Sequence, residues 1–319
     1  KTAPDGFVHN KAEQNVQFVY VDQDTPAVVE SVEFINERQK VEISVEKQDA
    51  ENGSTIAGAE FGLYAKEDIK AGGKVIVKAD EQLCTAVTGE DGTAIFEQNL
   101  PFGSYYIKEL QAPDGFVSSD EIIEVTVSYQ GQDVEVVRLK EIFKNQPTTV
   151  EFRKSDLTTG VELDGATLTV LDKDGNEIDK WTSVKGEPHI IKRLHVGETY
   201  ILREEFAPYG YLKAEEVEFT ITDTAEIQKV EMKDDVPIGR IIINKKGEFL
   251  SEVSWNDMVA GAMDSIWGYV TGSLKDVTFE IYAREDIKAA DGESDDYYKK
   301  DELVATIKTD ELGIARTDD

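Results

Sequence analysis

The chain has 319 residues, with 65 acidic against 34 basic side chains and a formal net charge of −31. This charge repels phosphate backbones and anionic lipids, so we expect neither nucleic acid nor a membrane surface as a partner. The chain lacks the run of about 18 apolar residues that a membrane-spanning helix needs, and its single cysteine, Cys84, excludes an internal disulfide. The length exceeds what one hydrophobic core usually supports, so several domains are expected.

The first segment, residues 1–38, begins with KTAPDGFVHN, which does not resemble a signal peptide. It contains the string APDGF at residues 3–7, which returns at 112–116 and, as APYGY, at 207–211. A longer string, EFGLYAKEDIKAGG from Glu60, is repeated as FEIYAREDIKAADG from Phe279, and VELDGATLTVLDKDG from Val161 is a shorter version. Repeats of this kind indicate tandem copies of one domain.

From residue 39 onward, short strand patterns follow one another. They read VEISVEK, AEFGLYA, TAIFEQ, SYYIKEL, EIIEVTVSY and VEVVRLKEIF, with EDG, DG and PFG turns between them. The alternation of apolar and polar residues places one face inward, and no long helical pattern intervenes. We therefore predict an all-β fold of tandem Ig-like β-sandwich domains, each of about 100 residues.

Three equivalent junctions mark the domain boundaries: NERQKVEISVEK, NQPTTVEFRKSD and DVPIGRIIINKK. They predict the C-terminal part of a truncated domain at 1–38, complete domains at 39–148 and 149–237, and the N-terminal part of a further domain at 238–319. Because each junction is only a few residues long, the domains are expected to lie end to end as a semi-rigid rod.

The stretch from Ser251, SEVSWNDMVAGAMDSIWGYVTGS, has no counterpart in the other copies. Several of its apolar residues recur near a period of 3.6: Val253, Met258, Val259, Met263, Ile266 and Trp267. This spacing favours a short helical insertion at about residues 251–272. The aromatic residues Trp255, Trp267 and Tyr269 leave two roles open, a docking surface or a helix that covers its own sandwich.

Polar side chains recur at equivalent places inside the apolar strands. The first strand of each copy carries an inward-facing lysine: Lys47, Lys154 and Lys245. A carboxylate lies three residues before the alanine of the APDGF or APYGY string: Glu109 and Glu204. The last strand of each copy supplies an amide or acid: Asn36, Asn145 and Asp235. Burial of a charged group is costly unless it is paired, so these recurrences point to a shared role.

This combination resembles the Cna B-type domains, also called prealbumin-like or SpaA-like pilin domains, of Gram-positive surface proteins. Its most specific part is Y-x-x-x-E-x-x-A-P-x-G-[FY], which is complete at residues 105–116 and 200–211. In that family the lysine and the Asn or Asp form an intramolecular isopeptide bond with the help of the Glu. The resemblance implies two triads: Lys47, Glu109 and Asn145 in the first complete domain, and Lys154, Glu204 and Asp235 in the second.

Neighbouring residues compete for two positions of the second triad. Glu205 adjoins Glu204, and the motif spacing favours Glu204. Asp234 adjoins Asp235, and an alignment that places Pro147 over Pro237 favours Asp235, with Asp234 kept as the alternative acceptor.

The two end segments hold incomplete sets. Asn36 is an acceptor without its lysine or Glu, and Lys245, which competes with Lys246, lacks a Glu and an acceptor. We therefore expect no isopeptide bond within either segment.

The residue types suit amide formation. An amine attacks only when it is neutral, and burial among apolar side chains lowers the pKa of an amine. The same surroundings raise the pKa of a carboxylic acid, which can then protonate the acceptor oxygen and the leaving group. Folding supplies the proximity. Ammonia leaves from an Asn acceptor and water from an Asp acceptor.

This chemistry is internal and single-turnover, so no enzyme activity on an outside substrate and no cofactor are expected. The histidines His9, His189 and His195 are too few and scattered for a metal or a Ser-His-Asp centre. The stretch LDKDGNEID from Leu171 lacks EF-hand spacing and indicates a hairpin turn instead of a calcium site. No metal site is predicted.

Two functions remain. We favour a structural stalk or pilus-like shaft, in which the bonds carry tension past the hydrogen bonds of the strands. The alternative is an adhesin segment that binds a host matrix protein or glycan through the insertion. The resemblance implies an extracellular, cell wall-anchored protein of a Gram-positive cell, with neighbouring domains or other pilus subunits as partners. Within the 319 residues no LPxTG-type sorting signal occurs, so wall attachment rests on the resemblance alone.

Overall fold

A computed structural model describes residues 2–96, 99–259 and 262–318, with the backbone alone for 255–259 and 262–264. The chain divides into two compact units. The first comprises residues 1–151, 190–199 and 220–229, and the second comprises 152–189, 200–219 and 230–319. The described residues contain strands and no helix, so the all-β prediction is confirmed. None of them forms a helix able to cross a membrane.

The first copy of the repeat is a sandwich of two sheets. Its strands are β1 (Lys40–Asp49), β2 (Glu60–Ala65), β3 (Ile69–Ala71), β4 (Lys74–Val77), β5 (Gln82–Val87), β6 (Thr93–Phe96), β7 (Gly103–Gln111), β8 (Ile122–Val127) and β9 (Val136–Asn145). One sheet has the order β6-β1-β9 and the other β5-β2-β7-β8, while β3 and β4 form a separate hairpin. The central strand β1 runs antiparallel to β6 and parallel to β9.

The core of this copy lies between the two sheets. Alternate residues of β1 are buried, as the strand period of two requires. Val45 on β1, Phe61 on β2, Ile107 on β7 and Phe143 on β9 are fully buried and belong to one apolar cluster. The inward face of β1 therefore presents every second side chain to a dry interior.

The second copy repeats this order. Its strands are β10 (Thr149–Asp156), β11 (Thr167–Leu171), β12 (Glu177–Thr182), β13 (His189–Lys192), β14 (Thr199–Phe206), β15 (Val217–Thr220) and β16 (Gln228–Asp234). The sheets are β13-β10-β16 and β12-β11-β14-β15. Strand by strand, β10 takes the place of β1, β14 that of β7 and β16 that of β9.

The last segment repeats part of the strand pairing of the first copy. Its strands are β17 (Ile242–Asn244), β18 (Lys246–Val259), β19 (Ala262–Ser273), β20 (Thr278–Tyr282), β21 (Leu303–Lys308) and β22 (Ile314–Arg316). Its pairs β17-β22 and β20-β21 match β1-β6 and β2-β5 of the first copy. Lys245 N donates to Gly313 O and Lys245 O accepts from Leu274 N, as Lys47 does with Gly92 and Ile56.

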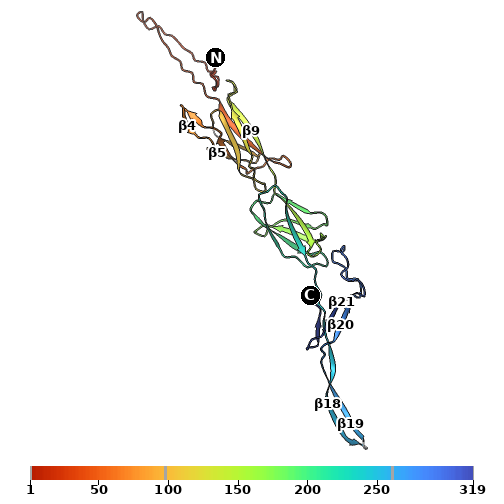
Figure 1. Ribbon diagram of the computed structural model, residues 1–319. Helices are drawn as coiled ribbons and strands as arrows, with labels where there is room; N and C mark the ends of the chain where they lie inside the picture. The colour runs from red at the N-terminus through yellow and green to blue at the C-terminus, as the bar shows by residue number, and fades with distance from the viewer. Residues whose placement is uncertain (1, 97–98, 260–261, 319) are drawn as a thin grey trace. The chain divides into compact units, whose positions relative to one another are not determined.

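The predicted helix at about 251–272 is wrong, because the described residues of this stretch lie in the paired strands β18 and β19 (Figure 1). Val253 pairs with Trp267 and Leu250 with Tyr269 across the two strands. β-branched and aromatic residues favour such cross-strand pairs, and a few apolar residues at a period of 3.6 do not outweigh them. The side chains of Trp255, Met258, Val259 and Met263 lie outside the described part of the chain.

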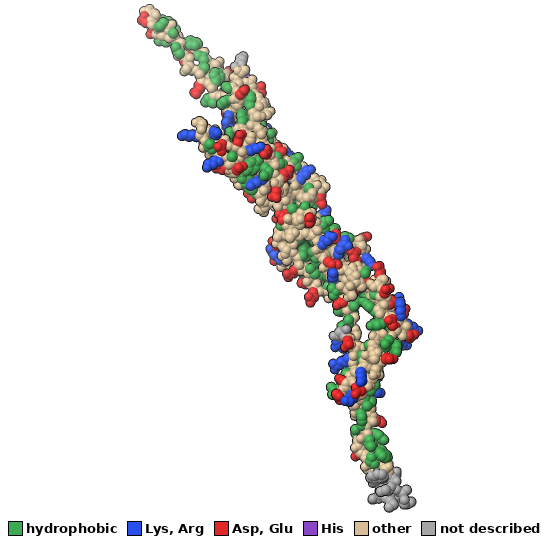
Figure 2. All heavy atoms as spheres, in the orientation of Figure 1, with side chains coloured by type: hydrophobic (Ala, Val, Ile, Leu, Met, Phe, Trp, Pro, Cys, Tyr) green, Lys and Arg blue, Asp and Glu red, His purple; other side chains and the backbone are tan. Residues whose placement is uncertain are grey.

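The N-terminal segment forms no strand within residues 2–38, so the strand expected around Asn36 is wrong. Phe7 makes an isolated bridge with Arg38, and Val8 N donates to Glu37 O at 2.8 Å. A strand needs a neighbour for its backbone hydrogen bonds, and within residues 2–96 no strand lies beside 31–36. Hydrophobic side chains of this segment, Phe18 and Tyr20 among them, are exposed. Figure 2 shows hydrophobic side chains in green on the surface of the chain.

Candidate functional site

The strand geometry brings the first predicted triad together. Lys47 lies on the buried face of β1, opposite Phe143 of β9, and Asn145 lies two residues further along β9 on the same face. Glu109 comes from β7 of the facing sheet, where it pairs with Phe61 of β2. Three strands that are far apart in the sequence therefore place one polar side chain each at the same point of the core.

The three side chains contact one another directly. Lys47 Nζ donates to Asn145 Oδ1 and lies 2.8 Å from Glu109 Oε1. Asn145 Nδ2 donates to both Glu109 oxygens at 2.9 Å. The side chains of Lys47 and Glu109 are 0% and 1% exposed. Glu109 thus bridges the amine and the carboxamide, as a group that moves protons between them would have to do.

The surroundings of Lys47 disfavour its charge. The rings of Phe61 and Phe143 lie 5.5 and 5.9 Å from Nζ. Burial lowers the pKa of Lys47, and this outweighs the opposing effect of Glu109. A lowered pKa increases the fraction of neutral amine, which is the nucleophilic form.

The second triad has the same construction with a different acceptor. Lys154 of β10 donates to Asp234 Oδ1 of β16, and Lys154 Nζ forms an ion pair at 3.1 Å with Glu204 Oε1 of β14. All three side chains are 0% exposed. In both triads a backbone N–H ten residues after the Glu donates to its second oxygen: Ser119 to Glu109 at 2.9 Å and Ala214 to Glu204 at 2.7 Å.

The structure places Asp234 beside Lys154, so the choice of Asp235 is corrected. Val230, Met232 and Asp234 are the buried residues of β16, and Asp235 follows on the exposed side. Asp235 Oδ1 instead accepts from the amide of Val236. The alternation V-x-M-x-D was the signal for Asp234, whereas the alignment of the two prolines was one residue out of register.

Asp234 of the second triad holds a proton more tightly than an ordinary aspartate does. Burial raises the pKa of Asp234 to about 6, with Lys154 opposing and Glu204 reinforcing the shift. Asp234 Oδ2 is buried without a hydrogen-bond partner among the described residues, and Glu204 Oε1 has only its ion pair with Lys154. Protonation of Asp234 supplies a hydrogen-bond donor between the two carboxyls, and it gives the acid form that can lose water.

Other candidate residues lie apart from these clusters. Glu205 is half-buried on the opposite side of β14 from Glu204. Lys245 takes the backbone position of Lys47, which favours it over Lys246, but its side chain is exposed. Asn36 is half-buried, and no lysine or Glu of the described residues completes a triad around it.

Sequence analysis missed one recurrent residue of each cluster. Asp49 and Asp156 follow Lys47 and Lys154 by two positions and are also buried. The repeated K-x-D pattern at the end of the first strand was the available signal.

The comparisons with known proteins agree with this architecture. The family model described as the SpaA prealbumin-like fold domain matches residues 41–141 and 148–236, more than half of the chain. The chain belongs to the SpaA prealbumin-like family. No curated protein matches it.

The solved structures that are similar to this chain include the Bacillus anthracis TIE protein and two pilus proteins. The Bacillus anthracis TIE protein is 23% identical with a TM-score of 0.46, and the match covers 88% of this chain and 44% of that one. The shaft pilin SpaA from Lactobacillus rhamnosus GG is 17% identical with a TM-score of 0.28, covering 62% of this chain and 98% of the pilin. A C-terminal fragment of the pilus adhesin SpaC from the same organism is 15% identical with a TM-score of 0.40, covering 63% and 98%.

Proposed function

We propose that the chain is part of a structural stalk or pilus-like shaft of a bacterial surface protein, in which each complete domain is closed by an isopeptide bond. Membership of the SpaA prealbumin-like family supports the structural role. The two buried triads support the bond, and the contact of Glu109 with both Lys47 and Asn145 is the observation that carries it. Domains at 39–148 and 149–237 each hold one complete triad.

In the first domain the neutral Nζ of Lys47 attacks Cγ of Asn145. Glu109 takes a proton from the attacking nitrogen and returns it to Nδ2, which already donates to the Glu109 carboxylate. The Nζ–Cγ bond forms, the Cγ–Nδ2 bond breaks and ammonia leaves. Burial and fixed geometry supply the proximity that the reaction needs, and each domain reacts once.

In the second domain the acceptor is a carboxylic acid. Lys154 attacks Cγ of Asp234, whose raised pKa increases the fraction of the protonated form, and Glu204 moves the proton to the departing oxygen. Water leaves in place of ammonia. The mass lost on bond formation therefore differs between the two domains, so each bond can be followed separately.

The placement of the bonds suits a load-bearing role. Lys47 lies near the end of β1 and Asn145 ends β9, the first and last strands of the sandwich. A bond between them lets tension pass from β1 to β9 without loading residues 48–144. It also restricts the unfolded chain, and a closed loop of roughly 100 residues is worth about 4 to 5 kcal/mol in the loop-entropy model.

Single-molecule stretching of the whole chain tests this function. We expect residues 48–144 and 155–233 to contribute no extension at any force that leaves covalent bonds intact. Glu109→Gln should release only the first of these lengths and Glu204→Gln only the second. Full extension of both stretches in the unmodified chain would contradict the proposed shaft.

The exposed side chains of the β18-β19 hairpin favour a second candidate, an adhesin segment. Trp267 is 53% and Tyr269 58% exposed. Binding of the chain to a host matrix protein or glycan, lost when residues 247–272 are removed, would favour this role. Extracellular location and attachment to a Gram-positive wall belong to the same proposal, with other pilus subunits or neighbouring domains as partners.

A further inference from the structure

Asp49 links the end of β1 to the acceptor of the first triad. It lies on the same buried face as Lys47, and it stands opposite Asn145 in the parallel pairing of β1 with β9. The next amide, Ala50 N, donates to Asn145 O at 3.0 Å. The position of Asp49 therefore sets how β1 and the acceptor meet.

The Asp49 carboxylate is fully buried, and hydrogen-bond donors from nearby residues stabilise its charge. Its Oδ1 accepts from Glu51 N at 2.8 Å. Its Oδ2 accepts from Arg193 Nη2 at 2.6 Å, and the other donor to that oxygen, Asn52 Nδ2, is at 3.4 Å. A buried carboxylate that loses its one close cationic partner is strongly destabilised. Arg193 is thus the main partner of Oδ2.

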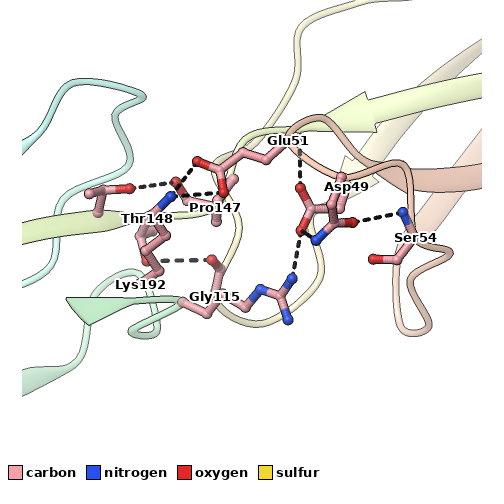
Figure 3. A network of polar contacts seen from close by, with 10 residues as sticks. Asp49, Glu51, Ser54, Gly115, Pro147, Thr148 and Lys192 are labelled. Carbon is pink, nitrogen blue, oxygen red and sulfur yellow. Dashed lines mark hydrogen bonds and ion pairs between the residues drawn. The ribbon is translucent and has the colours of Figure 1, made fainter. Parts of the chain in front are cut away.

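The segment that carries Arg193, residues 190–199 of the first unit, is held in place by its backbone. Arg193 N donates to Thr148 O at 3.0 Å, and Thr148 N donates to Gly115 O at 3.0 Å (Figure 3). A Cβ at Gly115, where φ is +80°, would lie 2.7 Å from Arg193 O, so this position requires glycine. Lys192 adds an ion pair with Glu51 at 2.7 Å (Figure 3).

In the second copy, the donor to the equivalent buried aspartate comes from the same copy of the repeat. Asp156 occupies the position of Asp49, and its Oδ2 accepts from Tyr211 Oη at 2.8 Å. Tyr211 is the last residue of APYGY, and its counterpart in APDGF is Phe116, which has no hydroxyl. The Arg193 guanidinium lies 5.4 Å from the Phe116 ring and donates to Asp49. One arginine therefore replaces the missing hydroxyl.

We propose that Arg193 is a positioning residue for the first isopeptide bond. It belongs to the second matched stretch, residues 148–236, and it holds Asp49 beside Asn145. Bond formation in the first domain therefore depends on the correct placement of segment 190–199. This inference rests on the proposed function. The second domain has its own donor, Tyr211, so its Lys154–Asp234 bond does not depend on Arg193.

The test follows both bonds in the whole chain during cell-free synthesis, by mass spectrometry of the two cross-linked peptides at fixed times. Arg193→Ala should slow formation of the Lys47–Asn145 bond by roughly tenfold, in line with the cost of misplacing reacting groups. The Lys154–Asp234 bond in the same molecules should form at its usual rate. Lys192→Ala, which removes the exposed ion pair of the same segment, is the matched control and should change neither bond.

Replacement of Phe116 by Tyr distinguishes positioning from a general loss of stability. In the Arg193→Ala background, Phe116→Tyr supplies the hydroxyl that Tyr211 provides in the second copy, and it should restore the rate. Arg193→Lys should restore it in part. An unchanged rate in Arg193→Ala, or no rescue by Phe116→Tyr, would overturn the inference while leaving the bond itself in place. Absence of the Lys47–Asn145 peptide from the unmodified chain would instead overturn the proposed function.

Discussion

Lys47 Nζ donates a hydrogen bond to Asn145 Oδ1, although the two residues are 98 positions apart in the sequence. Both side chains lie inside an apolar core, where an unpaired ammonium would be costly. Glu109 completes the contact from the facing sheet. A covalent bond between the same two groups would remove the charge and join the first strand to the last.

The carboxyl of Glu109 should be indispensable for the first bond. Glu109→Gln preserves the size of the side chain but cannot accept and return a proton, so bond formation should fall by at least about a hundredfold. Peptide mass spectrometry should find the Lys154–Asp234 cross-link and no Lys47–Asn145 cross-link. An unimpaired first bond in Glu109→Gln would show that Glu109 is not the proton carrier.

The acceptor of the second bond is decided by two neighbouring substitutions. Asp234→Ala should abolish the loss of water, whereas Asp235→Ala should leave it unchanged, because Asp235 is exposed and Asp234 is buried against Lys154. Asp234→Asn offers a further check, since any bond that forms would release ammonia. Loss of the bond in Asp235→Ala alone would contradict the assignment.

Removal of a bond should lower thermal stability in a domain-specific manner. Glu109→Gln should destabilise the first domain by about 4 to 5 kcal/mol, the loop-entropy value for a closed loop of roughly 100 residues. Calorimetry should show one transition moved to lower temperature and one unchanged. The reciprocal variant, Glu204→Gln, should move the other transition, and a shift of both by either variant would argue against separate bonds.

Asp49 should make stability depend on pH in the acid range. Burial opposes ionisation of Asp49, yet hydrogen bonds from the Glu51 amide and from Arg193 hold its pKa below its ordinary value of 3.8. A lowered folded-state pKa contributes stability above the unfolded value, and this contribution is lost as the pH falls through the folded value. The stability difference between the unmodified chain and Asp49→Asn should therefore be constant from about pH 5 to 7 and shrink below about pH 4. A difference that persists at low pH would exclude the ionised carboxylate as its source.

The β18-β19 hairpin should be dispensable for the strands around it. Lys245 and Leu274 make the backbone hydrogen bond that Lys47 and Ile56 make in the first copy, where residues 48–55 close the gap. Replacing residues 246–273 with the sequence of 48–55 should leave the pairs β17-β22 and β20-β21 intact. Amide hydrogen exchange at Lys245 and Ile243 measures this, and rapid exchange after the replacement would show that the hairpin supports the strands.

Much of the fold and of the first triad could be predicted from the sequence, because local patterns encode them. The alternation of V-x-I-x-V-x-K places Lys47 inward wherever the strand lies, and the Y-x-x-x-E spacing does the same for Glu109. Asp235 was misassigned because a proline after the strand does not determine which of two adjacent residues faces the core. The link after Asp234 is one residue longer than the link after Asn145.

Two other features depend on contacts that no local pattern contains. The apolar spacing of residues 251–272 fits a helix and a hairpin, and the cross-strand pairs of Val253 with Trp267 and Leu250 with Tyr269 appear only in the folded chain. The role of Arg193 is similarly hidden, because it is 144 positions from Asp49. The one indication in the sequence is that Phe116 lacks the hydroxyl of its counterpart Tyr211, so Asp49 needs another donor.

The intact mass of the fully denatured chain decides whether the two isopeptide bonds form. Isopeptide bonds survive denaturation, so we expect a mass below that of the sequence by one ammonia and one water. A mass equal to that of the sequence would contradict this expectation.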